Sequence, residues 1–276
     1  MLICQLTDLH VRPVGVAANL VSETNAFTER AFTVAAALPS KPDLILITGD
    51  LTEAGQAEEY RNLAAILRRT LSQPVHVIPG NHDRRDMLRA ELGHLPGVLS
   101  DPVFVQYTIE DHPVRVIMLD TLVPGANHGA LTGTRLEWPD RTLAEQPSRL
   151  TLIGMHHPPF ITGIPHMDRI NLQDAAAFTS VIARHRQVER IICGHHHRPV
   201  FGRCAHAIVS IAPSVGHQVA LTFDPLDAGA FNFEPPAFQL HRWDEAAGIV
   251  SHTVYTDSYR GPFPFVMDPN YPGAKS

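Results

Sequence analysis

Short apolar runs alternate with helical patterns along the first two-thirds of the chain, and this alternation restricts the possible folds more than any other feature. The runs have the length of buried strands. They are Leu2–Leu6, Asp43–Thr48, Val75–Ile78, Val114–Leu119, Leu150–Met155 and Val188–Cys193. Helical patterns lie between several of them, at Glu23–Leu38, Ala57–Leu71, Arg84–Leu92 and Asp174–Arg186. Strands that alternate with helices predict an α/β domain with a largely parallel core sheet.

The pattern changes after Cys193, where strand-like runs follow one another without helices between them. These runs are Ala207–Ile211, Val219–Phe223, Ala237–Arg242 and Ile249–Tyr255. They predict either an antiparallel edge on the first sheet or a second sheet packed against it. An earlier pair, Val103–Ile109 and Val114–Asp120, flanks a turn and predicts an antiparallel hairpin. Asp224–Pro236 is rich in Pro, Gly and Asp and predicts a loop or lid, and the proline-rich tail beyond Gly261 predicts irregular structure.

Composition excludes several classes of function. The 276 residues carry a net charge of −6 without blocks of like charge, which does not favour binding to a nucleic-acid polymer or to a membrane surface. The start of the chain lacks the pattern of a signal peptide, and no apolar segment has the length of a membrane span. The three cysteines, Cys4, Cys193 and Cys204, have no metal-ligand spacing and cannot form a disulfide framework. We therefore expect a cytoplasmic protein in which Cys4 and Cys193 are inert core thiols.

Five of the predicted strands are followed directly by residues that commonly bind metals. The segments are Thr7-Asp8-Leu9-His10, Thr48-Gly49-Asp50, Pro79-Gly80-Asn81-His82-Asp83, His156-His157-Pro158-Pro159 and Gly194-His195-His196-His197. Each segment alone is weak evidence for a metal site, because a Gly-Asp after a strand is more often a turn and a histidine run can be a solvated loop. The carboxyl ends of strands in an open α/β sheet line one crevice, however, and ligands bind there. Together, the five segments predict a single site.

The residue types in these segments suit a pair of metal ions. Two cations roughly 3.5–4 Å apart need a shared oxygen ligand, because their charges otherwise repel without compensation. Asp50, which we place centrally in the sheet order, is the natural bridge. Imidazoles and carboxylates accept Fe, Mn, Zn or Co, of which we favour Fe and Mn, and the absence of cysteine ligands argues against a closed structural zinc site. The sequence therefore predicts two divalent metal ions in an open, reactive site.

The five segments, in this order, resemble the signature of the calcineurin-like metallophosphoesterases. Within that family the chain is most similar to the bacterial class III cyclic nucleotide phosphodiesterases and the bacterial glycerophosphodiesterases. The likeness includes His156-His157-Pro158-Pro159, Pro213–Val219, and the stretch from His241 through Tyr259–Pro262. It implies a four-layer α/β/β/α sandwich with a small C-terminal cap or oligomerisation segment. We expect a catalytic domain over residues 1–223, with residues 224–276 completing the fold as a cap or as a contact in a homo-oligomer.

The resemblance also implies roles for individual residues. The first metal ion would be held by Asp8, His10, Asp50 and His197, and the second by Asp50, Asn81, His156 and His195. Asn81, a neutral amide, is the weakest ligand, so we expect the second ion to bind less tightly. His82 would contact the substrate phosphate, with Asp83 orienting it, and both are expected to be catalytic. Asn81, His82 and His217 would bind substrate.

Three departures from the family pattern stand out. His196 replaces the usual polar residue between two ligands and is expected to be a harmless filler. Gly216 is an extra residue before His217. The cysteines that link subunits in the glycerophosphodiesterase have no counterpart.

The implied reaction is hydrolysis of a small phosphodiester, either a 3′,5′-cyclic nucleotide or a glycerophosphodiester, by a hydroxide that bridges the two metals. Alternatives are a phosphonate or phosphomonoester hydrolase of the same family, and a non-catalytic scaffold on this fold. A protein phosphatase is disfavoured because Leu51-Thr52-Glu53 lacks the Arg-Gly that those enzymes carry after the bridging aspartate. A nuclease would need a basic groove, which the net charge of −6 does not favour. Substrate choice depends on the pocket walls, which we place at Val11–Asn19, Thr121–Gly133, Phe160–Ile170 and His217 with the loop that follows it.

Overall fold

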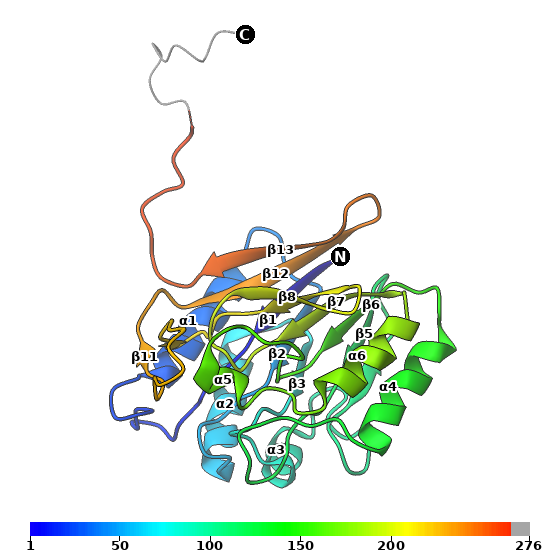
Figure 1. Cartoon of the computed structure of the whole chain (residues 1–276). Helices are drawn as coiled ribbons and strands as arrows, with labels where there is room; N and C mark the ends of the chain where they lie inside the picture. The colour runs from blue at the N-terminus through cyan, green and yellow to red at the C-terminus, as the bar shows by residue number, and fades with distance from the viewer. Residues whose placement is uncertain (266–276) are drawn as a thin grey trace.

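The computed structural model describes residues 1–265, which form two stacked sheets with helices on both outer faces (Figure 1). The first sheet contains, in spatial order, β13 (Gly248–Tyr255), β12 (Ala237–Asp244), β1 (Leu2–Leu6), β2 (Leu44–Thr48) and β3 (Val75–Ile78). The second contains β4 (Tyr107–Ile109), β5 (Arg115–Met118), β6 (Thr151–Gly154), β7 (Val188–Cys193), β9 (Ala207–Ile211) and β8 (Val200–Cys204).

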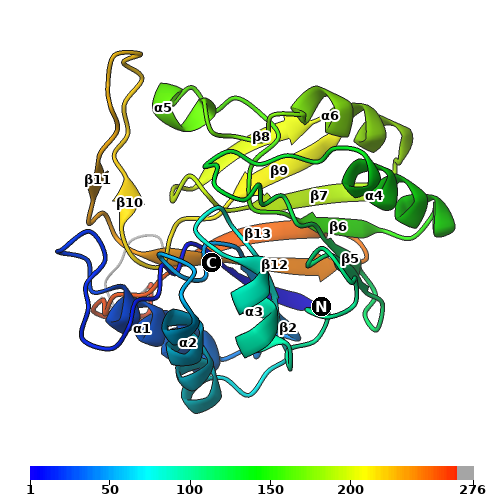
Figure 2. The ribbon, with the colours of Figure 1, turned by 90° about the horizontal axis from the view of Figure 1, so that it is seen from below.

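Helices cover the two sheets from opposite sides, as Figure 2 shows. The first sheet carries α1 (Thr24–Ala37), α2 (Ala57–Thr70) and α3 (Arg85–Leu92). The second carries α4 (Thr134–Glu145), α5 (Pro165–Asp168) and α6 (Ala175–Arg184). The predicted four-layer α/β/β/α sandwich is therefore confirmed. None of the helices in residues 1–265 has the length and apolarity that a membrane crossing requires.

Each sheet has a parallel centre and antiparallel edges. β1, β2 and β3 are parallel, and so are β5, β6, β7 and β9. The edges are added by β12 and β13 on β1, by β4 on β5 and by β8 on β9. The largely parallel core that the pattern predicts is therefore divided between two sheets. Of the late strands, β12 and β13 form the predicted antiparallel edge of the first sheet, whereas β9 pairs in parallel with β7 in the second.

The two sheets are held in register by polar side chains as well as apolar packing. Gln5 on β1 donates from Nε2 to the Cys193 carbonyl at the end of β7 (2.8 Å). Its Oε1 accepts from Nε2 of the buried His241 on β12 (3.0 Å). A second bond joins Ser210 on β9 to Gln239 on β12. Because buried hydrogen bonds are lost if the partners shift, the Gln5–Cys193 and Ser210–Gln239 bonds specify how the sheets stack. The strand ends that carry the predicted site are thereby brought to one edge.

Several elements differ from the sequence predictions, among them the one-turn helix α5, which was not predicted. Helix α4 was not predicted, since Pro139 lies inside it and removes one helical hydrogen-bond donor. Strand β8 was also missed, because its alternating exposure makes it a sheet edge without a continuous apolar run. The predicted strand Val219–Phe223 is wrong: only β10 (Gln218–Val219) is extended. It pairs with β11 (Phe231–Asn232) inside the predicted loop Asp224–Pro236, forming a hairpin apart from both sheets. The end of the proline-rich tail, residues 266–276, lies outside the described residues.

Candidate metal centre

All five predicted segments meet at one edge of the sandwich, three from the first sheet and two from the second. Backbone and side-chain bonds join the two sheets there. The backbone amide of His195, after β7, donates to the carboxylate of Asp8, after β1 (3.1 Å). His156, after β6, contacts the carbonyl of Thr48 at the end of β2 through Nδ1 (2.8 Å). The site therefore lies between two sheets rather than along one.

The backbone at this edge adopts a conformation that most residues avoid. Asp8, His10, Asp50, His195 and His197 all have φ between 47° and 71°. They are five of the eight non-glycine residues with positive φ among residues 1–265. Such residues cost roughly 1–3 kcal/mol each and persist where the surrounding structure requires them, commonly at functional sites. The strain therefore coincides with the predicted ligand set.

One half of the centre is formed by His10, His197, Asp8 and Asp50. The Nε2 atoms of His10 and His197 lie 3.1 Å apart. Nδ1 of His10 bonds Glu53 Oε2 at 2.7 Å, and Nδ1 of His197 donates to the His217 carbonyl at 2.9 Å. In the neutral rings both Nε2 atoms then carry lone pairs that face each other. Asp8 Oδ1 lies 3.4 Å from Nε2 of His197, and Asp50 Oδ2 lies 3.7 Å from Nε2 of His10.

The other half repeats this arrangement around His156. In the neutral ring its Nδ1 donates to the Thr48 carbonyl, so Nε2 carries a lone pair. That Nε2 faces two further acceptors, Asp50 Oδ2 at 3.3 Å and Asn81 Oδ1 at 3.2 Å. The ring of His195 packs edge-on against His156, with ring centroids 5.2 Å apart. Asp50 faces both halves, although β2 is next to the middle strand of its sheet rather than the middle strand itself.

Acceptors that converge without donors are the pattern expected of cation ligands, so the donor set fits a pair of divalent metal ions. The pKa values of His10 and His156 show the same attraction of this site for positive charge. Burial lowers the pKa of His10, but the hydrogen bond to Glu53 and the charge of Asp50 outweigh it and raise the pKa to about 9. Burial also lowers the pKa of His156, but the charge of Asp50 outweighs burial and raises this pKa to about 9. The carboxylates thus attract positive charge to the atoms where a metal ion would bind.

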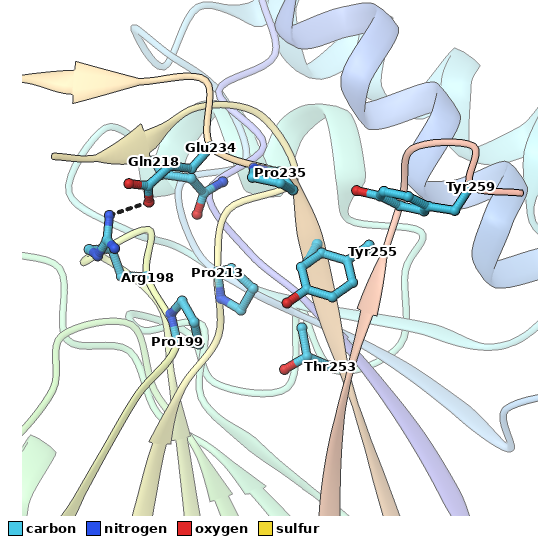
Figure 3. A pocket seen from close by; sticks show the side chains of 10 residues that line it. Arg198, Pro199, Pro213, Gln218, Glu234, Pro235, Thr253, Tyr255 and Tyr259 are labelled. Atoms are coloured by element: carbon cyan, nitrogen blue, oxygen red, sulfur yellow. Dashed lines mark hydrogen bonds and ion pairs between the residues drawn. The ribbon is translucent and has the colours of Figure 1, made fainter. Parts of the chain in front are cut away.

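A pocket of about 270 Å³ opens onto these atoms. Its lining includes the polar side chains of Asn19, Glu53, His82 and Asn127. It also includes the apolar side chains of Met167, Ile170, Val219 and Phe231. A larger pocket, of about 550 Å³, lies elsewhere (Figure 3). Tyr255, Tyr259 and three prolines line it, with the Arg198–Glu234 ion pair (2.5 Å) at one end. It contains none of the predicted ligands, so size alone does not identify the reactive site.

Comparison with known proteins agrees with this geometry. Residues 1–199 match the family described as calcineurin-like phosphoesterase. The chain belongs to this family. It is 36% identical to a probable glycerophosphodiester phosphodiesterase, GpdQ, of Arcobacter nitrofigilis, over 96% of this chain and 97% of that protein. It is 38% identical to a probable cyclic nucleotide phosphodiesterase of Synechococcus, over 71% of this chain and 73% of that protein. The 3′,5′-cyclic adenosine monophosphate phosphodiesterase CpdA of Escherichia coli K12 is 31% identical over 56% of this chain and 54% of that protein.

Solved structures show the same fold. A dimetal phosphatase from Danio rerio superposes with a TM-score of 0.63 at 16% identity, over 93% of this chain and 99% of that one. At this identity the likeness concerns the fold alone. It agrees with the two-sheet sandwich described above.

The sequence prediction for Asp83 in this phosphoesterase is corrected by the structure. Asp83 makes no hydrogen bond to His82. Its buried carboxylate accepts instead from the amides of Leu51 (2.9 Å) and Gly80 (2.9 Å) and from the Tyr60 hydroxyl (2.8 Å). Asp83 therefore clamps the loop after β2 to the loop after β3, and through them it places the neighbouring Asp50 and Asn81.

Glu53 is the residue that the sequence analysis missed. Its Oε2 accepts from Nδ1 of His10, and its carbonyl accepts from Nδ1 of His82 (2.7 Å). In both neutral rings the proton is then on Nδ1 and the lone pair on Nε2. Glu53 therefore decides which nitrogen each histidine presents to the site. A glutamate three residues after Asp50 gives no signal by itself, because only the fold brings His10 beside it.

The two remaining predicted residues, His82 and His217, line the pocket. His82 donates its backbone N–H to Asp50 Oδ1 (2.9 Å), and its ring lines the pocket. His217 lines it too, with ring centroids 4.9 Å from His197 and 4.9 Å from Phe231 on β11. The predicted walls Val11–Asn19, Thr121–Gly133 and Phe160–Ile170 contribute Asn19, Asn127, and Met167 with Ile170.

Proposed function

We propose that this phosphoesterase hydrolyses small phosphodiesters, with glycerophosphodiesters as its substrate class, using two divalent metal ions. The charge of the pocket carries the preference for diesters. Among residues 1–265, its lining contains no Lys or Arg, and it contains the carboxylate of Glu53. A monoester near neutral pH brings a second negative charge, which the lining would not compensate. A diester carries one charge.

Asp8, His10, Asp50 and His197 would hold one ion, and Asp50, Asn81, His156 and His195 the other, with Fe and Mn favoured. Such a pair supplies a nucleophilic hydroxide at neutral pH and neutralises charge on the phosphoryl oxygens. The amide of Asn81 is the weakest donor of the set, so the second ion should bind less tightly. Closed structural zinc sites use four strong ligands, and this set instead leaves positions for substrate.

His82 acts on the substrate side of the centre. Its Nδ1 donates to the Glu53 carbonyl, so Nε2 is the atom available to a substrate. In the protonated ring, Nε2 donates to a phosphoryl oxygen or to the departing alkoxide, which lowers the energy of the developing charge. The backbone bond from His82 to Asp50 fixes the distance between this group and the centre.

The length of the similarity supports a glycerophosphodiester. The likeness to the A. nitrofigilis protein covers 96% of this chain and so includes the β10–β11 hairpin, which supplies Val219 and Phe231 to the pocket wall. The amides of Asn19 and Asn127 and the carboxylate of Glu53 suit the hydroxyls of a glycerol group. A cyclic nucleotide is the second candidate, because the Synechococcus relative is 38% identical.

The remaining proposals concern assembly and location. We propose that residues 1–223 form the catalytic domain and that residues 224–276 contribute a cap or a contact between subunits of a homo-oligomer in the cytoplasm. Light scattering after size-exclusion chromatography tests the oligomer, and a single-subunit mass would contradict it.

The test of function compares bis(p-nitrophenyl) phosphate, p-nitrophenyl phosphate, glycerophosphoethanolamine and cyclic AMP after chelation and Mn²⁺ addition. We expect metal-restored hydrolysis of diesters above the monoester, with glycerophosphoethanolamine preferred over cyclic AMP. Asp50→Ala should abolish the activity, and Asp86→Asn, a change at an exposed ion pair, should retain it. Activity that persists in Asp50→Ala, or that needs no metal, would overturn the two-metal proposal. A protein that binds no metal pair would be a scaffold.

A further inference from the structure

Two buried histidines, His157 and His196, stand beside proposed metal ligands in the chain. His157 follows His156, and His196 lies between His195 and His197. Both are fully buried, with 0% of their surface exposed. The ring nitrogens of each already contact polar groups of the protein. These contacts therefore give their burial a physical cause.

His157 holds the segment 121–130. Its Nε2 faces the carbonyl of Asn127 (3.2 Å), so Nε2 carries the proton and donates it. Nδ1 then accepts from the Thr121 hydroxyl (2.7 Å). Gly129 packs so closely on the ring that a Cβ there would overlap it. This segment delivers the Asn127 side chain to the substrate pocket.

His196 holds the segment 160–171 in the same way. Nδ2 of Asn171 donates to the Phe160 carbonyl and to Asp168, so its Oδ1 is an acceptor. His196 therefore donates to that Oδ1 from Nε2 (2.6 Å). The Thr162 hydroxyl lies 3.4 Å from the other ring nitrogen. This segment delivers the apolar pocket residues Met167 and Ile170.

The two segments also join each other. The amide of Gly129 donates to the Asn171 carbonyl (3.3 Å), and the amide of Gln173 donates to the Gly129 carbonyl (2.9 Å). Segment 160–171 continues the wall to the β10–β11 hairpin, since Gly163 lies against Phe223 and Gly229 lies against His166. Segments 121–130 and 160–171 therefore form one continuous side of the pocket, and each is hydrogen-bonded to one of the two histidines.

We propose that His157 and His196 are positioning residues that fix the two walls of the substrate pocket relative to the metal-binding strands and so determine which diester fits. The proposal rests on the proposed function. It replaces the expectation that His196 is a filler. Because each histidine adjoins a proposed ligand in the chain, a wall displaced from its histidine loses its alignment with the reacting phosphate, and misplacement by about 1 Å can cost roughly 100-fold in rate.

The test uses His157→Leu and His196→Leu, which remove the donors, beside His157→Gln and His196→Gln, which keep a donor near the Nε2 position. His76→Leu is the control, because His76 is a buried histidine on β3 outside both walls. Amide hydrogen exchange is measured on metal-free protein. Each Leu variant should speed exchange by about tenfold in the segment that its histidine holds, because a buried hydrogen bond is lost. The Gln variants should restore protection.

Kinetics provide the second readout, with metal content measured in every variant. For bis(p-nitrophenyl) phosphate and methyl p-nitrophenyl phosphate, the Leu variants should change the ratio of the two KM values while metal content stays at the wild-type level. If a Leu variant does not fold, Thr121→Val and Thr162→Val remove partners of the same rings. Unchanged exchange in both segments, or equal effects in His76→Leu, would overturn the proposal. Wild-type protein that hydrolyses neither diester would contradict the proposed function instead, while exchange would still report on the walls.

Discussion

Replacing Asp83 with Asn tests how the loop after β2 is joined to the loop after β3. The carboxylate accepts five hydrogen bonds from four residues. Leu51 N and Gly80 N reach Oδ2, while Thr52 N, Thr52 Oγ1 and Tyr60 OH reach Oδ1. Asparagine has one oxygen, so whichever way its amide turns, at least two buried donors lose their acceptor.

The size of the effect follows from those lost bonds. Each buried donor without an acceptor costs about 1–3 kcal/mol. Two such donors would cost about 2–6 kcal/mol, and removal of a buried charge offsets part of this. We expect Asp83→Asn to lower the free energy of unfolding by about 2–4 kcal/mol. Because the clamp also places Asp50 and Asn81, affinity for Mn²⁺ should fall by about 10–100-fold.

The assay is urea unfolding of metal-free protein followed by circular dichroism, so that metal binding does not contribute to stability. Asp86→Asn is the control, since its ion pair with Arg84 is exposed and should contribute less than about 1 kcal/mol. Isothermal titration with Mn²⁺ then measures affinity. If Asp83→Asn unfolds at the same urea concentration as Asp86→Asn, the carboxylate does not clamp the loops and the reasoning is wrong.

Three further predictions follow from single contacts. Glu53→Gln weakens the charged hydrogen bond to His10, so metal affinity measured by chelator competition should fall by about tenfold, and an unchanged affinity would contradict this role. His241→Gln concerns pH: burial, with the charge of Arg190, lowers the His241 pKa to about 3, so wild-type stability is lost as pH falls below about 6.5. The difference in unfolding free energy between wild type and variant should shift in the variant's favour by about 2 kcal/mol from pH 7 to pH 5, and a constant difference would refute it. Gly194→Ala places a Cβ against Thr7 and should cost about 1–3 kcal/mol in thermal unfolding, whereas Gly216→Ala has room and should be near neutral.

Local pattern was sufficient to predict most elements. β1, β3 and β7 have the predicted bounds, and α1, α2, α3 and α6 differ by one or two residues at their ends. Continuous apolar runs identify strands that are buried on both faces, and those are the strands that carry the predicted ligands. Some elements outside this rule were missed, as β8 shows with its half-exposed residues and α4 with its internal proline.

The sequence by itself determined which residue types end each buried strand, and therefore that metal ligands gather at one edge. Only the tertiary structure decided what each side chain does there. It assigned Asp83 to the loops rather than to His82, placed Glu53 against His10, and occupied the ring nitrogens of His157 and His196 with the pocket walls. The physical reason is that strand formation depends on neighbours in the chain, whereas a hydrogen bond depends on which distant atom the packing of two separate sheets brings within about 3 Å.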